Sequence, residues 1–337
     1  MINAAEAFDA AARHALAGEA NIAPSVHNIQ PARFRFLDDG AIAVLEDVRR
    51  RLPVADPSGA DSWKSLGAAS EGLAIALSAR GFATHVVRID AAETNAATRQ
   101  VARITVAGDS APDRLRAFVP QRATWRGAFA AKDAHATKGL ETLRATGDLT
   151  LVEGRTAIAE VAKLYDATSL VTLRDAAYRL ELRSWMRLAR LNRNWGRDGL
   201  NAHAMALSGF EAAGADIVLG KRMFSAFDKI GLAAPLIAEG AKVRGAAAVG
   251  LFHRPAEEHA FEAGRRFYRL WLEITAAGLC LCPMSVLADT PATATQLKAQ
   301  FGVDPARTLV SVFRIGIRPA RAKQPRRARL PAWDLIV

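Results

Sequence analysis

The sequence predicts an α+β fold in which two similar halves are joined in one chain, each with a small mixed β-sheet flanked by helices. Each half has a long helix pattern rich in small residues, with short strand patterns before and after it. Gly67 and Gly81 bound the first helix pattern, and Gly264 and Gly278 bound the second at the same spacing, 197 residues further on. Chance similarity of two helices rich in alanine and leucine explains this register almost equally well, so the repeat needs further support.

The first half has the pattern of a helix, a hairpin, a buried helix and two strands, at residues 3–17, 33–45, 66–80, 86–89 and 103–106. Gly18 is expected to end the first helix as the C′ residue. The turn at residues 38–40 reads Asp-Asp-Gly between two apolar stretches, which is typical of a β-hairpin. The small residues of the second helix allow another helix to approach closely, so we expect this helix to lie deep in the protein.

The second half adds strand patterns at residues 246–252 and 310–317 and a strand or turn at residues 281–287. We place the boundary between the halves near residue 110, which gives units of residues 1–110 and 111–337. Residues 155–240 are mostly helical in pattern and are expected to form an arm or lid. Five arginines recur there at helical spacing, on a solvated face in the favoured interpretation or on a surface for an anionic substrate. They are Arg179, Arg183, Arg187, Arg190 and Arg197.

The composition predicts a globular protein, since 50% of the 337 residues are hydrophobic and 23% are charged. The longest apolar runs are too short to span a bilayer, and the first residues lack the basic cluster of a signal peptide. Cys280 and Cys282 are the only cysteines, so no disulfide framework is expected, and no further ligands stand near them at metal spacing. We therefore expect a cytoplasmic protein with neither a metal site nor a membrane segment.

The net charge of +11 is unevenly spread, because residues 318–329 carry six basic residues and no acidic one. Such a run is able to bind nucleic acid, but no DNA- or RNA-binding motif accompanies it and aromatic residues are sparse around it. A solvated tail or a contact with a phosphate group is the favoured interpretation, and no nucleic-acid partner is expected.

The most distinctive loop of the chain occupies residues 23–31. Its two prolines, Pro24 and Pro31, restrict themselves and their predecessors to extended or turn geometry. Ser25, Asn28 and Gln30 can offer hydrogen-bond donors and acceptors to the edge of a planar ligand. From these residues alone, a simple connector between a helix and a strand is an equally good interpretation.

The Pro-Ser-x-x-Asn-x-Gln-Pro pattern of residues 24–31 resembles the flavin-ring loop of the nitroreductase family. Residues 122–126, Arg-x-Thr-x-Arg, resemble the family's segment for the FMN phosphate, and residues 327–329 resemble the basic tail that completes it. The chain as a whole resembles the Acg-like branch, in which two nitroreductase-like halves are fused into an intrachain pseudo-dimer. One departure is Ala32, where the family usually has tryptophan beside the flavin.

The resemblance implies one composite FMN site per chain, because the ring loop stands only in the first half and the phosphate segment only in the second. We expect residues 122 and 126 to share one face of a helix, and the backbone of residues 283–285 to lie near flavin N5. The expected FMN-binding residues are Pro24, Ser25, Asn28, Gln30, Arg122, Thr124, Arg126, Pro283, Met284, Ser285, Arg327 and Arg329.

The function that the resemblance implies is an FMN-dependent oxidoreductase that takes hydride from NAD(P)H for a small acceptor such as a nitroaromatic, a quinone or an enone. No side chain is expected to be catalytic, because the flavin carries the chemistry. His27 and His203 are candidate proton donors, although a structural role is favoured for each. Alternatives are a protein that stores FMN with little turnover and an enzyme that consumes the flavin with oxygen. A further homodimer is left open.

Overall fold

The computed structural model describes residues 8–93, 97–323, 325 and 327–337. It contains ten strands and twelve helices in those ranges, and the α+β class is as predicted. The elements in chain order are α2 (Ala10–Ala20), β1 (Ala32–Phe36), β2 (Ile42–Asp47), α3 (Ala60–Ser78), β3 (Phe82–Glu93), β4 (Thr98–Asp109), α4 (Ala134–Arg144), β5 (Leu149–Val152), α5 (Arg155–Arg174), α6 (Ala176–Trp185), β6 (Met186–Arg187), β7 (Leu200–Asn201), α7 (Gly209–Val218), α8 (Lys221–Lys229), α9 (Ala233–Ile237), α10 (Gly240–Arg244), β8 (Ala248–Pro255), α11 (Ala260–Ala276), β9 (Cys280–Pro283), α12 (Val286–Asp289), α13 (Pro291–Gln300) and β10 (Arg307–Gly316).

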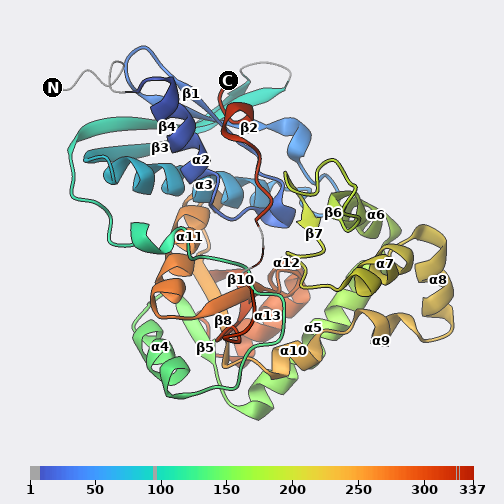
Figure 1. Ribbon diagram of the computed structural model, residues 1–337. Coiled ribbons are helices and arrows are strands. Elements are labelled where there is room, and N and C mark those ends of the chain that lie inside the picture. The colour runs from blue at the N-terminus through green and yellow to red at the C-terminus, as the bar shows by residue number, and fades with distance from the viewer. Residues whose placement is uncertain (1–7, 94–96, 324, 326) are drawn as a thin grey trace.

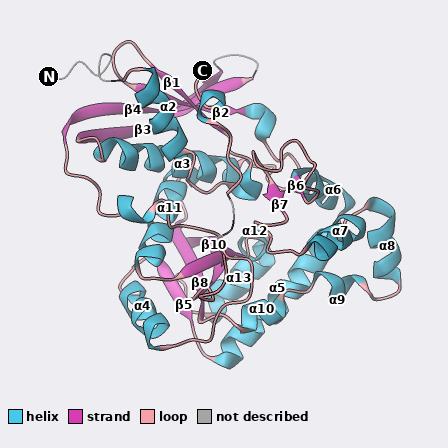
Figure 2. Ribbon diagram, in the orientation of Figure 1, coloured by secondary structure: helices cyan, strands magenta, loops and turns pink. Residues whose placement is uncertain are grey.

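Two four-stranded sheets with the same topology dominate the molecule (Figures 1 and 2). The first has the order β1-β2-β4-β3 and the second has the order β5-β8-β10-β9. Every strand pair within the two sheets is antiparallel, which corrects the predicted mixed sheets; the isolated bridges that flank them at Phe34–Ile336 and Thr124–Leu281 are parallel. In each sheet the first, second, fourth and third strand of the unit lie side by side, and a long helix, α3 or α11, joins the second strand to the third.

The two long helices pack against each other at the centre of the molecule through reciprocal glycine contacts. A Cβ atom added to Gly67 of α3 would lie 1.9 Å from the carbonyl oxygen of Phe261, and one added to Gly264 of α11 would lie 2.1 Å from that of Lys64. Residues 64 and 67 correspond to 261 and 264 on the register of the predicted repeat. The contact is therefore self-complementary, as across a two-fold axis.

Each half also sends a segment to the other. Beyond β4, the backbone of Thr124 pairs with Leu281 of β9, and the N–H of Ala130 donates to Ile317 O at 2.8 Å. Beyond β10, the chain returns to the first sheet, where Ile336 pairs with Phe34 of β1. The predicted C-terminal unit of residues 111–337 thus needs a correction, because its last residues pack in the core of the first half.

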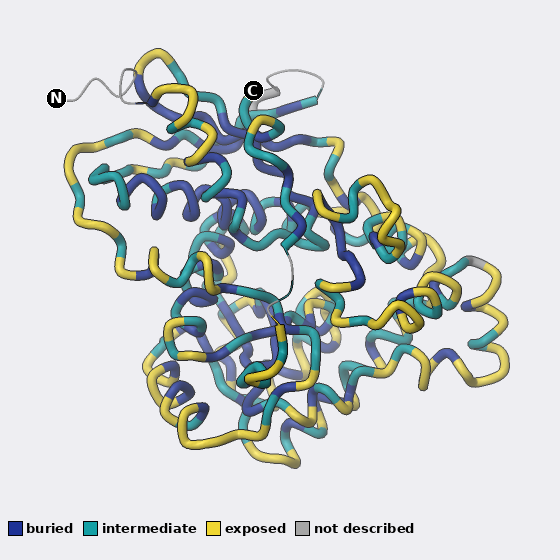
Figure 3. Tube along the Cα trace, viewed as in Figure 1, coloured by how far each residue is buried: buried dark blue, intermediate teal, exposed yellow. Residues whose placement is uncertain are grey.

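One local prediction is wrong, because Gly18 does not end the first helix. α2 continues through Gly18 to Ala20, since Ala17 and Ala20 bury against the first core, and the C-cap is Asn21. The start predicted at residue 3 lies outside the described residues. The arm begins with the 20-residue helix α5 and continues with the shorter helices α6 to α10. Its outer part has a largely exposed surface, whereas α3 is buried along most of its length (Figure 3). No helix of the described residues is long and apolar enough to cross a membrane.

Candidate functional site

The ring loop, residues 23–31, has an unusual backbone that its own side chains stabilise. His27, Asn28 and Gln30 all have positive φ, at 43°, 57° and 51°. Such angles disfavour residues with a Cβ atom and need support from the surroundings. The Ser25 hydroxyl accepts from the N–H of Gln30 at 3.0 Å, and the Gln30 amide oxygen accepts from Asn21 Nδ2 at 2.8 Å. Ser25 and Gln30 therefore shape the loop from within.

Asn28 joins the ring loop to the C-terminal segment. Its amide nitrogen donates to Gly199 O at 3.1 Å and to Ala328 O at 3.0 Å. Its amide oxygen accepts from Arg329 Nη1 at 2.6 Å. Both functions of the amide are thus used by protein groups, and Asn28 positions one arginine of the C-terminal segment directly.

Three arginines from two distant segments gather beside this loop, and we call Arg122, Arg327 and Arg329 the arginine cluster. Arg122 is 3% exposed and donates to Ile22 O at 2.8 Å, while Arg329 donates to the same carbonyl at 3.1 Å. Arg327 donates to Arg122 O at 2.5 Å. These bonds end on neutral carbonyl oxygens, and no ion pair with a carboxylate is present for any of the three among the described residues.

The charges of the cluster repel one another. Burial, followed by the charges of Arg122 and Arg327, lowers the pKa of Arg329 to about 9. Burial likewise lowers the pKa of Arg122 to about 10, with Arg327 adding to the effect. Positive charges this close and this buried need an anion, because an uncompensated buried charge is costly.

The cluster is surrounded by buried donors that lack partners. The Nε atoms of Arg122 and Arg329, the hydroxyl of Tyr268 and the indole Nε1 of Trp271 have no hydrogen-bond partner among the described residues. Tyr268 lies within electrostatic range of all three arginines, and the Arg122 guanidinium stacks 4.7 Å from the centre of the Trp271 ring. Buried polar atoms without partners are rare, so together they indicate a site for a ligand with several acceptor oxygens. A phosphate group fits that description.

Tyr268 and Trp271 are site residues that the sequence did not reveal. Both stand on the buried face of α11, where they are 0% and 3% exposed. In the sequence they are indistinguishable from core positions of an amphipathic helix. A hint was available, because tyrosine and tryptophan each carry a polar group that needs a partner when buried.

The phosphate segment, residues 122–126, is extended, and the predicted helix is wrong. Pairing of Thr124 with Leu281 and the bond from Trp125 N to Leu281 O at 3.0 Å hold it against the edge of the second sheet. Arg126 points away from the cluster: it donates to Ala204 O at 3.0 Å, and its charge acts on His27. The structure therefore brings together Arg122, Arg327 and Arg329 and places Arg126 elsewhere.

His27 is half-buried, and its ring is neutral at physiological pH. Burial lowers its pKa to about 4, against the attraction of Asp61 and with a further lowering by Arg126. Its Nδ1 atom has no hydrogen-bond partner within the described part of the chain. An imidazole with this pKa cannot act as a cationic acid near neutrality. His203 makes an edge contact with the ring of Trp195, with centroids 5.1 Å apart.

Residues 283–285 lie at the end of β9 and the start of α12. Pro283 has no N–H, and the N–H of Met284 donates to Val312 O at 2.7 Å. Ser285 is therefore the one residue of these three whose backbone N–H is present and does not donate to a strand of the second sheet. Ser285 is exposed, and its carbonyl accepts from Ala288 and Asp289.

The predicted basic face of residues 179–197 does not form, because α6 ends at Trp185. Arg183 pairs with Asp216 at 3.0 Å and Arg187 with Asp198 at 2.9 Å. The remaining three arginines have other contacts: Arg179 stacks on Phe224, Arg190 on Trp195, and Arg197 pairs with Asp334. These arginines stabilise the arm, and neither of the two interpretations made from their spacing describes them.

Comparisons with known proteins add only a distant likeness. No family model matches the sequence, and no curated protein matches it. Among solved structures, an FMN-dependent nitroreductase from Mycobacterium smegmatis in complex with NADPH is 20% identical, with 60% of this chain and 86% of that chain covered and a TM-score of 0.32. A Bacteroides fragilis nitroreductase with bound FMN is 10% identical, with 63% and 91% covered and a TM-score of 0.30. A putative nitroreductase from Anabaena variabilis is 10% identical, with 88% and 82% covered and a TM-score of 0.39. At these scores, the function has to be argued from the residues of this chain.

Proposed function

We propose that this chain binds one FMN between its two halves and acts as an FMN-dependent oxidoreductase. The observation that carries the proposal is the arginine cluster, which has three guanidinium groups, no carboxylate partner among the described residues and unpartnered donors beside it. The bond between Asn28 and Arg329 connects this anion site to the ring loop. Asn28 and Arg329, which are 301 residues apart in the sequence, are thus in contact.

The residues present fit the phosphate of FMN. A phosphate monoester offers a charge near −2 and three acceptor oxygens, which match the charge and the empty donors of the cluster. Arg122, Arg327 and Arg329 would hold the phosphate, with Tyr268 as a further donor. The ring loop and residues 283–285 would lie along the isoalloxazine, with Thr124 and Arg126 between the two ends.

The chemistry that FMN supplies when bound is hydride transfer from NAD(P)H to a small oxidised acceptor such as a nitroaromatic, a quinone or an enone. The protein's own residues hold the binding groups in place and orient them. Asn28 fixes Arg329, Ser25 and Gln30 fix the ring loop, and neutral His27 adds no charge beside it. A backbone N–H at Ser285 would stabilise the negative charge that a reduced flavin ring carries.

We further propose that the chain is an intrachain pseudo-dimer. The reciprocal contacts at Gly67 and Gly264 and the shared strand order of the two sheets support this. The proposal predicts one composite site per chain, since the ring loop and the phosphate segment each occur once. A cytoplasmic location remains a prediction from composition.

The test is an FMN titration of the apo-protein, followed by quenching of flavin fluorescence. We expect one FMN per chain. Arg122→Met and Arg329→Met should each weaken binding by about ten- to a hundredfold, because each removes a charge-assisted bond worth roughly 1.5–3 kcal/mol. The matched control is Arg183→Met, which removes an exposed arginine paired with Asp216 on the arm. Two equivalent sites, or equal losses in all three variants, would overturn the proposal.

Turnover is measured separately, as NADPH and NADH consumption by the FMN-loaded protein with a nitroaromatic or a quinone. Oxidation of either nucleotide that depends on the acceptor identifies an oxidoreductase. Tight binding of FMN without such oxidation identifies the storage protein, and loss of the flavin spectrum under oxygen identifies the flavin-consuming enzyme.

A further inference from the structure

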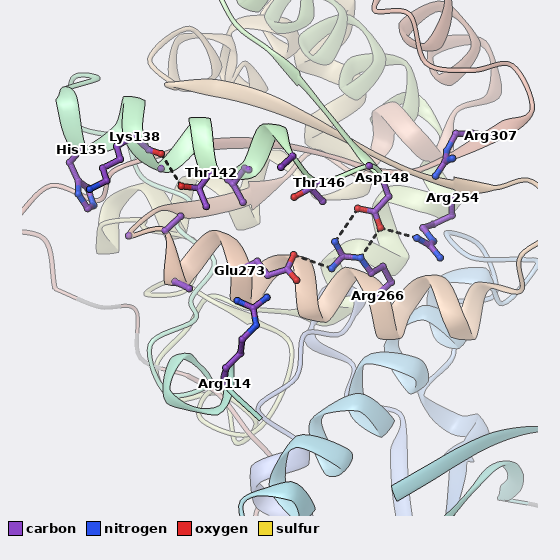
Figure 4. Close-up of a pocket in the computed structure, with 17 residues that line it drawn as sticks. Arg114, His135, Lys138, Thr142, Thr146, Asp148, Arg254, Arg266, Glu273 and Arg307 are labelled. Atoms are coloured by element: carbon purple, nitrogen blue, oxygen red, sulfur yellow. Dashed lines mark hydrogen bonds and ion pairs between the residues drawn. The ribbon is translucent and has the colours of Figure 1, made fainter. Parts of the chain in front are cut away.

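A groove of about 860 Å³ lies in the second half, away from the residues proposed to bind FMN. Helices α4 and α11 form its two walls, and the turn before β5 closes it with Thr146 and Asp148 (Figure 4). Lys138 lies towards one end, and Arg254 and Arg307 lie at the other, with Arg266 of α11 between them (Figure 4).

Positive charge exceeds negative charge along this groove. Five basic residues line it, against two carboxylates. The five are Arg114, Lys138, Arg254, Arg266 and Arg307. Both carboxylates are already neutralised: Asp148 accepts from Arg254 at 2.8 Å and from Arg266 at 2.7 Å, and Glu273 accepts from Arg266 at 3.1 Å.

The other three cations have no such neutralisation. Arg114, Lys138 and Arg307 make no ion pair with any carboxylate among the described residues, and they come from three different parts of the chain. Arg114 belongs to the segment that leaves the first half, Lys138 to α4 and Arg307 to β10. Surface cations are normally solvated, so the distinguishing feature is that these three converge on one hollow with two further arginines.

Arg307 carries the clearest sign of a missing partner. Its Nε atom is buried without a hydrogen-bond partner in the described part of the chain, and so is Nδ1 of the adjacent His253, which is 6% exposed. The charge of Arg307 acts on the His253 ring and disfavours its protonation. The Nε–H of Arg307 is a charged donor, and an anion in the groove would give it an acceptor.

We propose that this groove is a second anion site, which binds an elongated ligand carrying two or more phosphate groups. One phosphate group lies against Arg254, Arg266 and Arg307, and the next lies towards Arg114 and Lys138. We place a phosphate group at each end because Lys138 lies towards one end of the groove and Arg254 and Arg307 lie at the other (Figure 4). The volume is that of a small-molecule site and accepts a nucleoside diphosphate as well as free pyrophosphate.

The experiment titrates the full-length, FMN-loaded protein with sodium pyrophosphate and with ADP, by calorimetry and by thermal shift. Both probes should bind once per chain, with an affinity that falls as salt rises. Arg307→Met and Lys138→Met should each weaken pyrophosphate by about tenfold, the loss of one charge-assisted contact. Arg155→Met is the matched control, since Arg155 is an exposed arginine outside the groove. Tighter binding of ADP than of pyrophosphate assigns the ligand to nucleotides, and equal binding assigns it to free polyphosphate.

The apo-protein provides a second measurement. Arg307→Met removes a charged group whose Nε–H is buried without a partner in the described part of the chain, so it should keep or raise the melting temperature while reducing the shift with pyrophosphate. A stabilisation by pyrophosphate no larger than that by sodium chloride at equal ionic strength would overturn the proposal. So would equal affinity in Arg307→Met, Lys138→Met and Arg155→Met. Neither result bears on FMN binding, because no residue of the groove belongs to the proposed flavin site.

Discussion

The two halves of the molecule share a strand order but differ in their connections. A tight turn joins β1 to β2, whereas the corresponding strands of the second half, β5 and β8, are joined through the whole arm, α5 to α10. A similar contrast holds after the long helices, since β9 and β10 are separated by α12 and α13. The shared strands and central helices make the two cores, and the unshared connections carry the features that distinguish one half from the other.

The comparison also bears on why the proposed anion site lies on only one side of the helix pair. On the repeat register, Tyr268 of α11 corresponds to Glu71 of α3. Tyr268 lies beside three arginines that lack carboxylate partners within the described ranges, whereas Glu71 pairs with Arg265 at 3.0 Å and with Arg269 at 2.8 Å. A carboxylate thus fills the place where an anionic ligand would bind. On this proposal one side of the helix pair is left for a ligand, and the equivalent place on the other side is filled by the Glu71 carboxylate.

The largest expected effect is on the reciprocal contact of the halves. Gly67→Ala and Gly264→Ala each place a Cβ atom inside the van der Waals radius of a backbone carbonyl in the opposite helix, which cannot move aside alone. We expect each to lower the free energy of unfolding by about 4 kcal/mol, at the upper end of overpacking effects. Urea unfolding measures the change, and the two losses should be nearly equal because the contacts are equivalent.

Gly214→Ala is the control for these substitutions. Gly214 lies in α7 with nothing within 4 Å of an added Cβ atom, so alanine should raise stability by about 0.5–1 kcal/mol. Unequal losses at Gly67 and Gly264, with one near zero, would show that the two-fold relation of the helices is superficial.

The second prediction concerns the closed counterpart. Glu71→Gln leaves Arg265 and Arg269 without their shared carboxylate in a site where Glu71 is 5% exposed. The expected loss is about 2–3 kcal/mol, below that of a fully buried pair because both arginines reach solvent. Thermal melting at low and high salt checks it, and Glu262→Gln, at an exposed carboxylate that also pairs with Arg265, is the milder control. If Glu71→Gln loses no more stability than Glu262→Gln, the proposed difference between the Glu71 side and the Tyr268 side of the helix pair is wrong.

The sequence predicts the cores of both halves well and the site only in part. Small residues and bounding glycines mark α3 and α11, since close helix packing requires them wherever the helices sit. The extended course of residues 122–126 was not predictable, because pairing of Thr124 with Leu281 depends on a strand more than 150 residues away. The spacing of Arg183 and Arg187 fits a helix, yet α6 ends between them.

The ring loop shows the same limit at smaller scale. Its prolines predict a shaped loop, which is what the structure has. From the sequence, the Asn28 amide was expected to face a ligand edge. In the structure it already forms hydrogen bonds with Gly199, Ala328 and Arg329. Local sequence predicts which groups a loop offers, but partners from distant segments decide how they are used.

The third prediction is a pH dependence of stability that belongs to the first half. The pKa of His27 is about 4 in the folded protein and 6.5 when unfolded, so both states are neutral above pH 6.5. As the pH falls from 6.5 to 4, the unfolded chain takes up a proton that the folded chain does not, and stability declines. A pKa difference of one between the two states corresponds to about 1.4 kcal/mol in the free energy of unfolding. Because the His27 side chain is half-buried, we expect this free energy to fall by about 2 kcal/mol.

His27→Asn should remove that dependence, because asparagine tolerates the positive φ and does not titrate in this range. Urea unfolding at pH 7 and pH 5 measures the difference. His14→Asn, on an exposed position of α2, is the control and should keep the wild-type slope. If His27→Asn loses stability between pH 7 and pH 5 as wild type does, the ring is not the group that stays neutral in the fold.

The smallest expected effect tests how the ring loop acts on the arginine cluster. Asn28 accepts from Arg329 at 2.6 Å, and the corresponding turn of the second half, before β5, has Asp148 paired with Arg254 and Arg266 instead. If Asn28 positions Arg329 for the phosphate, Asn28→Gly should weaken FMN in wild type but much less when Arg329 is already methionine. Glycine suits the φ of 57°, so the substitution removes the amide without adding backbone strain. A double-mutant cycle on the FMN dissociation constant should give a coupling of about 1 kcal/mol, the value of one such hydrogen bond. Purely additive effects would show that Asn28 supports only the loop, and that the arginine cluster is held in place by the carbonyls of residues 22 and 328.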